Sequence, residues 1–302
     1  MSKEEFKIWW EENGKRGISF CECNYHNASL REIRQWVQEF KGVTNPISKH
    51  KPKQKNKVTI IQGGCFHFPQ HDPAAVNCFL KVAKYLNADY AVLTGDVADN
   101  SRHSSHNTDL GVLMTEALRQ KPMLREFLIS LKEKVKNVIY IRGNHEAWID
   151  DKKVLDIGLL HDDGFTVPTV LGFDDLDIQY EPDLWEYNDF VFKHGDSIAS
   201  GDNCSKVEFL GELRNGASSH THRSARYRHT TRTHQYVWYT TGCMCKLNMW
   251  YKLKGKSKIN SGWNHSFNVF KFIGKQFQCT QVEIIDGVCI YDGKLFDGNK
   301  EE

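Results

Sequence analysis

Five short clusters of histidine, aspartate, asparagine and glycine recur along the chain, and their residue types suit a metal centre. Each cluster follows an apolar or small-residue run: Cys65-Phe66-His67, Gly95-Asp96 to Asn100, Gly143-Asn144-His145-Glu146, His194-Gly195-Asp196 and His220-Thr221-His222-Arg223. Imidazoles, a carboxylate and a carboxamide form the mixed nitrogen and oxygen set that Zn, Fe or Mn accepts. The glycines let the backbone turn sharply, so that neighbouring side chains can converge on one point. The clusters together therefore predict a metal centre.

The elements that must position these clusters read as alternating strands and helices. Short apolar, β-branched runs predict strands at 58–61, 90–93 and 138–141, and helices are expected to begin at Asp72-Pro73 and at Pro122. This alternation predicts parallel strands, and open α/β sheets bind ligands where such strands end. After Tyr187, strand-like runs dominate, and the last of them contains Asp286-Gly287, a hairpin turn signal. The predicted fold class is α/β, with a β-rich second part.

The first 48 residues predict a separate helical module. Phe6, Trp9 and Trp10 lie at helical spacing, and a capping box at Ser29 and Glu32 opens a second amphipathic helix. Two short helices are compatible with a helix-turn-helix or a plain αα-hairpin, and the second helix shows no basic face, which favours the hairpin. Residues 49–57 are rich in lysine and read as a linker, so residues 58–302 form the main domain.

The overall composition is that of an ordinary globular protein and excludes a strongly charged binding protein. The 302 residues are 40% hydrophobic and carry a formal net charge of +2, so any basic surface must be local. We expect a cytoplasmic protein without membrane contact, because the sequence shows no secretory leader and no membrane-length apolar run. The 9 cysteines fit thiols in a reducing compartment. A zinc site made by Cys21, Cys23, Cys243 and Cys245 is disfavoured, since each pair is separated by one residue only.

The ordered clusters resemble the motifs of the calcineurin-like metallophosphoesterases. The family pattern is Asp-x-His, Gly-Asp-x-x-Asp, Gly-Asn-His-Glu, a later His-Gly and Gly-His-x-His, and it matches from about Val58 to Arg223. The block Gly143-Asn144-His145-Glu146 is the most specific element. The resemblance implies a layered sandwich of two mixed β-sheets flanked by helices, and a metal-dependent hydrolase acting on a phosphate ester.

The resemblance also implies a role for each matching residue. Asp96 would bridge two divalent ions, the first held by Cys65, His67 and His222 and the second by Asn144, His194 and His220. His145 would act as general acid toward the leaving oxygen while a hydroxide activated by both ions attacks phosphorus. Residues expected to orient the ligands from behind are Asp99, Glu146 and Asp196.

The sequence departs from the family pattern at Cys65, where the family usually has aspartate. A thiolate there could bind the first ion and favour Zn or Fe(II) over Mn or Mg; alternatively the first site is weak or empty, or the protein is a non-catalytic scaffold. The presence of His145 and the other ligands disfavours the scaffold. A cysteine before the histidine of the first motif also resembles the RNA lariat debranching enzymes. The later sequence that is characteristic of those enzymes is not found in this chain. Ser219 replaces a glycine that is usual before His220.

A basic stretch follows the last ligand pair and is the candidate substrate surface. Arg223, Arg226 and Arg228 alternate with aromatic residues, as in grooves where cations meet phosphates and rings stack on bases. The same pattern also fits a solvated strand face. We therefore expect a phosphodiesterase or nuclease acting on nucleic acid or a nucleotide; the alternatives are a phosphomonoesterase, or a binding scaffold with a degraded metal site whose N-terminal module docks a protein partner.

Overall fold

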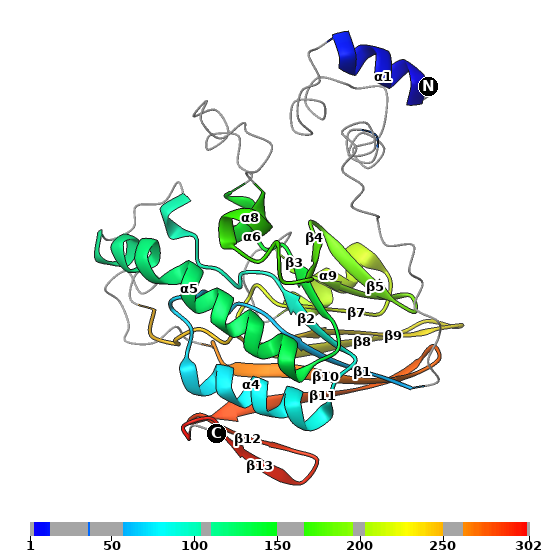
Figure 1. Cartoon of the computed structure of the whole chain (residues 1–302). Coiled ribbons are helices and arrows are strands. Elements are labelled where there is room, and N and C mark those ends of the chain that lie inside the picture. Colours follow the sequence, from blue (N-terminus) through cyan, green and yellow to red (C-terminus); the bar gives the residue numbers. More distant parts are fainter. Residues whose placement is uncertain are drawn as a thin grey trace. The chain divides into compact units, whose positions relative to one another are not determined.

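The computed structural model describes residues 3–12, 36, 57–103, 110–149, 166–195, 203–249 and 262–300 (Figure 1). The chain divides into two compact units, residues 1–54 and 55–302. In the first unit, α1 (Lys3–Glu12) buries Phe6, whose ring lies 5.3 Å from that of Trp36. The capping box at Ser29 and nearly all of the predicted linker lie outside the described residues. The choice between a hairpin and a helix-turn-helix therefore stays a prediction.

The larger sheet contains the parallel strands that the sequence predicts. Its order is β13-β12-β11-β10-β1-β2-β3-β4, with β1 to β4 parallel and the other pairs antiparallel. The strands are β1 (Val58–Gly63), β2 (Tyr90–Thr94), β3 (Val138–Ile141), β4 (Gln179–Glu181), β10 (His265–Ile273), β11 (Gln276–Ile285), β12 (Val288–Tyr291) and β13 (Lys294–Asp297). The turn at Asp286-Gly287 joins β11 to β12, which confirms the predicted hairpin.

The smaller sheet is also mixed. Its order is β5-β6-β7-β9-β8, and its strands are β5 (Leu184–Tyr187), β6 (Phe190–Lys193), β7 (Gly216–Ser218), β8 (Ala225–Thr230) and β9 (Gln235–Thr240). The three central strands run parallel, and the two edge strands run antiparallel to their neighbours. Helix α9 (Cys204–Glu212) packs on this sheet through Phe209, which is buried with Trp238.

Alternating side chains of the large sheet fill two separate cores, which gives the fold its layers. Leu93 and Tyr140 pack with helices α4 (Pro73–Leu86) and α5 (Leu110–Lys134) on one face. Their strand neighbours Val92 and Ile139 pack against Phe192 and other residues of the small sheet on the opposite face. This period of two is the signature of strands buried on both sides. The protein is thus an α/β sandwich of two mixed sheets with flanking helices (Figure 1), as predicted.

The two predicted helix starts had different outcomes. Asp72 caps α4 by accepting the amide of Ala75 at 2.9 Å, and Pro73 is the first helical residue, as expected. The prediction that a helix begins at Pro122 was wrong, because Pro122 lies inside α5. A proline costs the helix one hydrogen bond, and burial of residues such as Leu128 against the sheet holds this helix together across the gap. Among the described residues, no helix has the length and hydropathy needed to cross a bilayer.

Candidate metal centre

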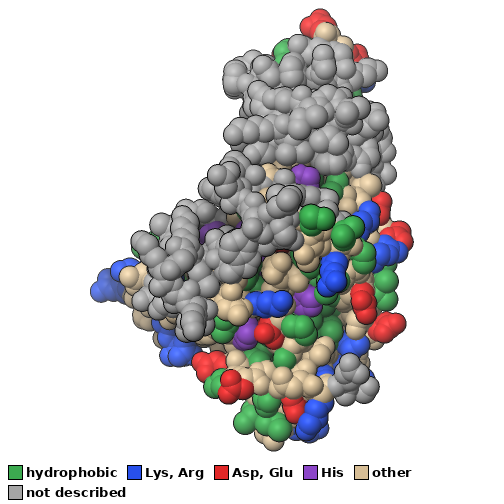
Figure 2. Space-filling view, turned by 90° about the vertical axis from the view of Figure 1, so that its left-hand side faces the viewer, with side chains coloured by type: hydrophobic (Ala, Val, Ile, Leu, Met, Phe, Trp, Pro, Cys, Tyr) green, Lys and Arg blue, Asp and Glu red, His purple; other side chains and the backbone are tan. Residues whose placement is uncertain are grey.

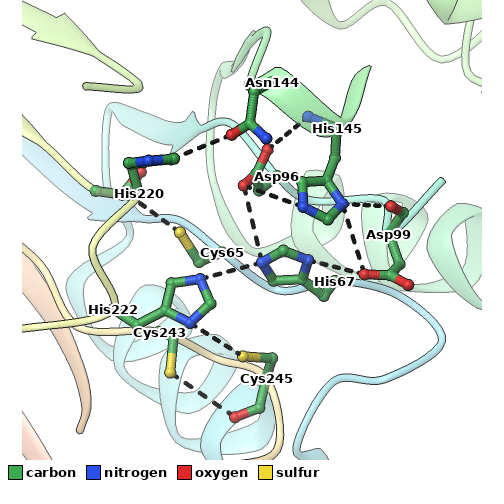
Figure 3. A network of polar contacts seen from close by, with 12 residues as sticks. Cys65, His67, Asp96, Asp99, Asn144, His145, His220, His222, Cys243 and Cys245 are labelled. Carbon is green, nitrogen blue, oxygen red and sulfur yellow. Dashed lines mark hydrogen bonds and ion pairs between the residues drawn. The ribbon is translucent and has the colours of Figure 1, made fainter. Parts of the chain in front are cut away.

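The predicted ligands converge where strands of both sheets end. Cys65 and His67 follow β1, Asp96 follows β2, and Asn144 opens α6 (Asn144–Ala147) directly after β3. His194 follows β6, and His220 and His222 follow β7. The loops after β1 and β2 are joined by backbone hydrogen bonds from Cys65 to Gly95 at 3.0 Å and from His67 to Asp96 at 2.9 Å. Side chains that are far apart in the sequence therefore point into one small volume (Figure 3).

At several ligand positions the backbone adopts left-handed φ values, which direct the side chains toward one another. Left-handed φ values occur at the ligand positions Cys65 (55°), His67 (53°), Asp96 (52°), His220 (66°) and His222 (59°). Such φ values are uncommon for residues other than glycine and gather at functional sites. Gly143 has a different task, because a Cβ there would lie 2.3 Å from both the amide nitrogen and Oδ1 of Asp96. Glycine at this position lets the loops after β2 and β3 touch.

One half of the centre brings together four acceptor atoms. Nδ1 of His194 donates to the carbonyl of Thr94 at 2.7 Å, which leaves the lone pair of Nε2 pointing inward. That Nε2 lies 3.2 Å from Asp96 Oδ2, 3.0 Å from Asn144 Oδ1 and 3.1 Å from His220 Nδ1. His220 Nδ1 is in turn 3.1 Å from Asn144 Oδ1. A single proton can join only two of these acceptors, whereas one cation can join all four. The donor set fits a divalent metal.

The other half has the same character and adds sulfur. Nδ1 of His67 donates to the carboxylate of Asp99 at 3.0 Å, so Nε2 presents its lone pair. This Nε2 faces Nε2 of His222 at 3.2 Å and Asp96 Oδ2 at 3.8 Å. The sulfur of Cys65 lies within 4.8 Å of ligand atoms of both rings, and also of Asp96 and His194. Asp96 therefore faces both halves, the position expected of a bridging ligand.

Contacts with histidines lower the pKa values of Asp96 and Asp99, whereas burial raises the pKa of the Cys65 thiol. Burial opposes ionisation of Asp96, but the neighbouring His194, His145 and His67 hold its pKa well below the usual range. Burial likewise opposes ionisation of Asp99, yet its contacts with His67 bring the pKa to about 2. The pKa of Cys65 is raised by burial and by the charge of Asp96. A Cys65 thiolate therefore requires a bound cation, whose uptake would release a proton.

His145 occupies the position expected of a proton donor. Its Nδ1 donates to the backbone carbonyl of Asp99, and this bond fixes the direction of the ring. Its Nε2 points at the centre, 3.9 Å from Asp96 Oδ2. The backbone amide of His145 also donates to Asp96 Oδ1 at 3.0 Å, which ties the two residues together.

The residues predicted to orient the ligands differ in what they contact. Asp99 holds His67, as expected. Glu146 was expected to orient an imidazole, but its described bonds go elsewhere: it accepts the amides of Gly143, Asp96, Val97 and Ala98 and the hydroxyl of Tyr140, at 2.7–2.9 Å. A fully buried carboxylate with five donors shapes the loop that carries Asp96. Asp196 lies outside the described residues.

The predicted substrate arginines lie at and beyond the rim of the centre. Arg223 is half-buried, with its guanidinium close to Gly262. Arg226 and Arg228 lie on the exposed side of the edge strand β8, where they approach Tyr239. On the face drawn in Figure 2, basic and acidic side chains of the described residues are interspersed. The role of these arginines stays a prediction.

Three further residues lie beside the centre and are not among its predicted ligands. The ring of Trp148 lies 4.1 Å from that of His145, and the ring of Trp263 lies 3.9 Å from that of His222. Cys245 Sγ lies 3.8 Å from His222 Nδ1, within a buried cluster that also includes Cys65 and Cys243 (Figure 3). Trp148 was missed by the sequence reasoning, and its i, i+3 spacing from His145 on a helix was the available signal. Cys21 and Cys23, the other members of the disfavoured zinc site, lie outside the described residues.

One comparison with known proteins identifies a family, and another finds distantly similar folds. The sequence model described as "Calcineurin-like phosphoesterase" matches residues 58–254. Similar solved structures include Vacuolar Protein Sorting 29 from Cryptosporidium parvum, at 12% identity, covering 80% of this chain and 100% of that chain with a TM-score of 0.44. Vps29 from Entamoeba histolytica complexed with Zn²⁺ has 12% identity, 80% and 99% coverage and a TM-score of 0.41. YfcE, a phosphoesterase from E. coli, has 14% identity, 74% and 98% coverage and a TM-score of 0.36. No curated protein matches the chain.

Proposed function

We propose that this chain, which belongs to the calcineurin-like phosphoesterase family, is a metal-dependent phosphodiesterase that acts on nucleic acid or a nucleotide. The observation that carries the proposal is the convergence of acceptor atoms on both sides of Asp96, where His194 Nε2 lies 3.2 Å and His67 Nε2 lies 3.8 Å from the same carboxylate oxygen. Acceptors packed this closely need cations between them. A degraded site would have lost some of these ligands.

The residues divide naturally between two divalent ions. Cys65, His67 and His222 would hold the first, and Asn144, His194 and His220 the second, with Asp96 shared. The sulfur ligand favours Zn or Fe at the first position, while the nitrogen and oxygen ligands of the second also accept Mn. When bound, such ions would supply polarisation of the phosphoryl oxygens and a water molecule of lowered pKa.

The protein's own side chains contribute position and a proton. The bond from His145 Nδ1 to the Asp99 carbonyl directs Nε2 into the centre, so a proton on Nε2 can pass to the leaving oxygen of the ester. The charge of Asp96, 3.9 Å away, stabilises a proton held there. Asp99 holds His67, and the four backbone amides bound by Glu146 keep the Asp96 loop in place.

The proposal that the substrate is a diester in nucleic acid or a nucleotide is based on the arginines near the centre. Arg223, Arg226 and Arg228 follow directly after the ligand His222 and offer cations for phosphates that flank the scissile one. The cytoplasm is the proposed compartment. Every cysteine in the described part of the chain is a free thiol, which supports a reducing environment.

The test compares two model esters with protein loaded with Mn²⁺, Fe²⁺ or Zn²⁺. We expect metal-stimulated hydrolysis of bis(p-nitrophenyl) phosphate that exceeds hydrolysis of p-nitrophenyl phosphate. His145→Asn should lower kcat about 100-fold or more without loss of metal, because general acid catalysis contributes 10²–10⁴-fold. His234→Asn, an exposed histidine in the turn after β8, is the matched control and should leave kcat unchanged. Faster monoester hydrolysis would make the protein a phosphomonoesterase, and no turnover with any of the metals would favour a scaffold.

A further inference from the structure

Two tryptophans stand at opposite ends of a row of imidazoles that crosses the centre. Ring centroids along the row are separated by 4.1 Å from Trp148 to His145, 4.5 Å from His145 to His67, 5.1 Å from His67 to His222 and 3.9 Å from His222 to Trp263. The three histidines are buried, with 1–4% of each residue exposed, whereas both tryptophans are half-buried. Each tryptophan therefore keeps part of its surface accessible beside the centre.

We infer that Trp148 and Trp263 are stacking platforms for nucleobases on the two sides of the scissile phosphate. This inference rests on the proposed phosphodiesterase function and specifies its substrate class, a diester between nucleosides. Aromatic platforms beside cationic side chains bind the flat face of any base. Each stacked base increases the affinity about tenfold. Arginines at the rim would hold the neighbouring phosphates in the same strand.

The backbone fixes both platforms. Trp148 is the C-cap of α6 in a regular helical conformation, and its amide donates to the carbonyl of Asn144 at 3.3 Å. Beside Trp263, the amide of Asn264 donates to the carbonyl of His222 at 3.1 Å, and its carbonyl accepts the amide of Cys243 at 2.9 Å. The backbone at each tryptophan is therefore held close to the histidine that the indole contacts, so binding a base would require little ordering of the backbone.

The order of rings in the row also indicates which side of the scissile phosphate each tryptophan would contact. His145 is the proton donor to the leaving oxygen, so Trp148, in contact with it, adjoins the leaving nucleoside. Trp263 contacts His222 at the other end and adjoins the group that stays on phosphorus. A monoester would have a group to place on one side only. A substrate with a base on each side uses both platforms.

A binding experiment tests the inference independently of turnover. Calorimetric titration of Mn²⁺-loaded protein should show thymidine 5′-phosphate binding about tenfold more tightly than 2-deoxyribose 5-phosphate. The variant Trp263→Ala should reduce this ratio, because the single base of thymidine 5′-phosphate belongs to the group that stays on phosphorus. Trp148→Ala should leave the ratio unchanged, and Trp263→Phe should largely preserve it. Trp185→Ala, at a half-buried tryptophan of β5 packed on Tyr90, is the matched control and should leave the ratio unchanged. Equal affinity for the two phosphates in the wild-type protein would overturn the inference.

A kinetic experiment separates a platform from a side chain that only positions a histidine. Thymidine 5′-(p-nitrophenyl) phosphate and methyl p-nitrophenyl phosphate share one leaving group and differ in the group that is retained. Trp263→Ala should lower the ratio of their kcat/KM values about tenfold, and Trp148→Ala should leave that ratio unchanged. An equal loss with both esters would reduce Trp263 to a positioning residue and overturn its platform role. If neither ester is hydrolysed, the proposed function fails and the binding ratio alone decides the inference.

Discussion

Replacing Gly143 by alanine tests whether the close contact of two loops positions the shared carboxylate. An added Cβ would lie 2.3 Å from the amide nitrogen and Oδ1 of Asp96, and 2.9 Å from Glu146 Oε2, where ordinary contact begins at 3.4 Å. The backbone of Gly143 is extended, with φ −98° and ψ −178°, which alanine adopts freely. The whole effect therefore comes from the clash, and Asp96 must retreat by about 1 Å.

A retreat of about 1 Å should lower kcat/KM about 100-fold, equivalent to about 2.7 kcal/mol of transition-state stabilisation. The assay is metal-dependent hydrolysis of bis(p-nitrophenyl) phosphate, together with elemental analysis of bound metal, which should also fall. Gly211→Ala is the matched control, because Gly211 lies exposed on α9 with nothing within 4 Å of the added Cβ. It should keep full activity and stabilise the protein by up to about 1 kcal/mol. Wild-type kcat/KM and metal content in Gly143→Ala would refute the reasoning.

Further predictions concern the ligand sulfur, the loop clamp and acid stability. Cys65→Asp should raise the ratio of Mn²⁺ to Zn²⁺ retained about tenfold by elemental analysis, and an unchanged ratio would argue against a sulfur ligand. Glu146→Gln places an amide donor against the amides that Glu146 accepts, and should lower the free energy of unfolding by about 3 kcal/mol in denaturant titrations. Burial and Lys246 lower the pKa of His71 to about 4 from 6.5, so the unfolded chain binds more protons between these values and stability falls as the pH falls. The loss at pH 5 should be about 2 kcal/mol, and equal pH dependence in His71→Gln would contradict this origin.

The local elements could be predicted because their signals are local. Short β-branched runs marked β1, β2 and β3, and Asp72-Pro73 marked the start of α4. The failure at Pro122 has the opposite cause, since the packing of α5 on the sheet outweighed the local preference of one residue. Propensity is a weak guide wherever tertiary burial opposes it.

Residue order alone establishes which side chains follow which strands, and hence that imidazoles, Asp96, Asn144 and the Cys65 thiol gather at one edge. Which atom of each side chain faces its neighbours depends on how the strands and loops pack in three dimensions. The carbonyl of Thr94 turns the lone pair of His194 inward, and the amides around Glu146 give that carboxylate a task different from the expected one. Trp148 and Trp263 lie on separate segments of the chain, and they too come close to the centre only in the folded structure. Hydrogen bonds and ring contacts between distant segments form only when the two sheets pack together. The order of residues in the sequence carries no signal of that packing.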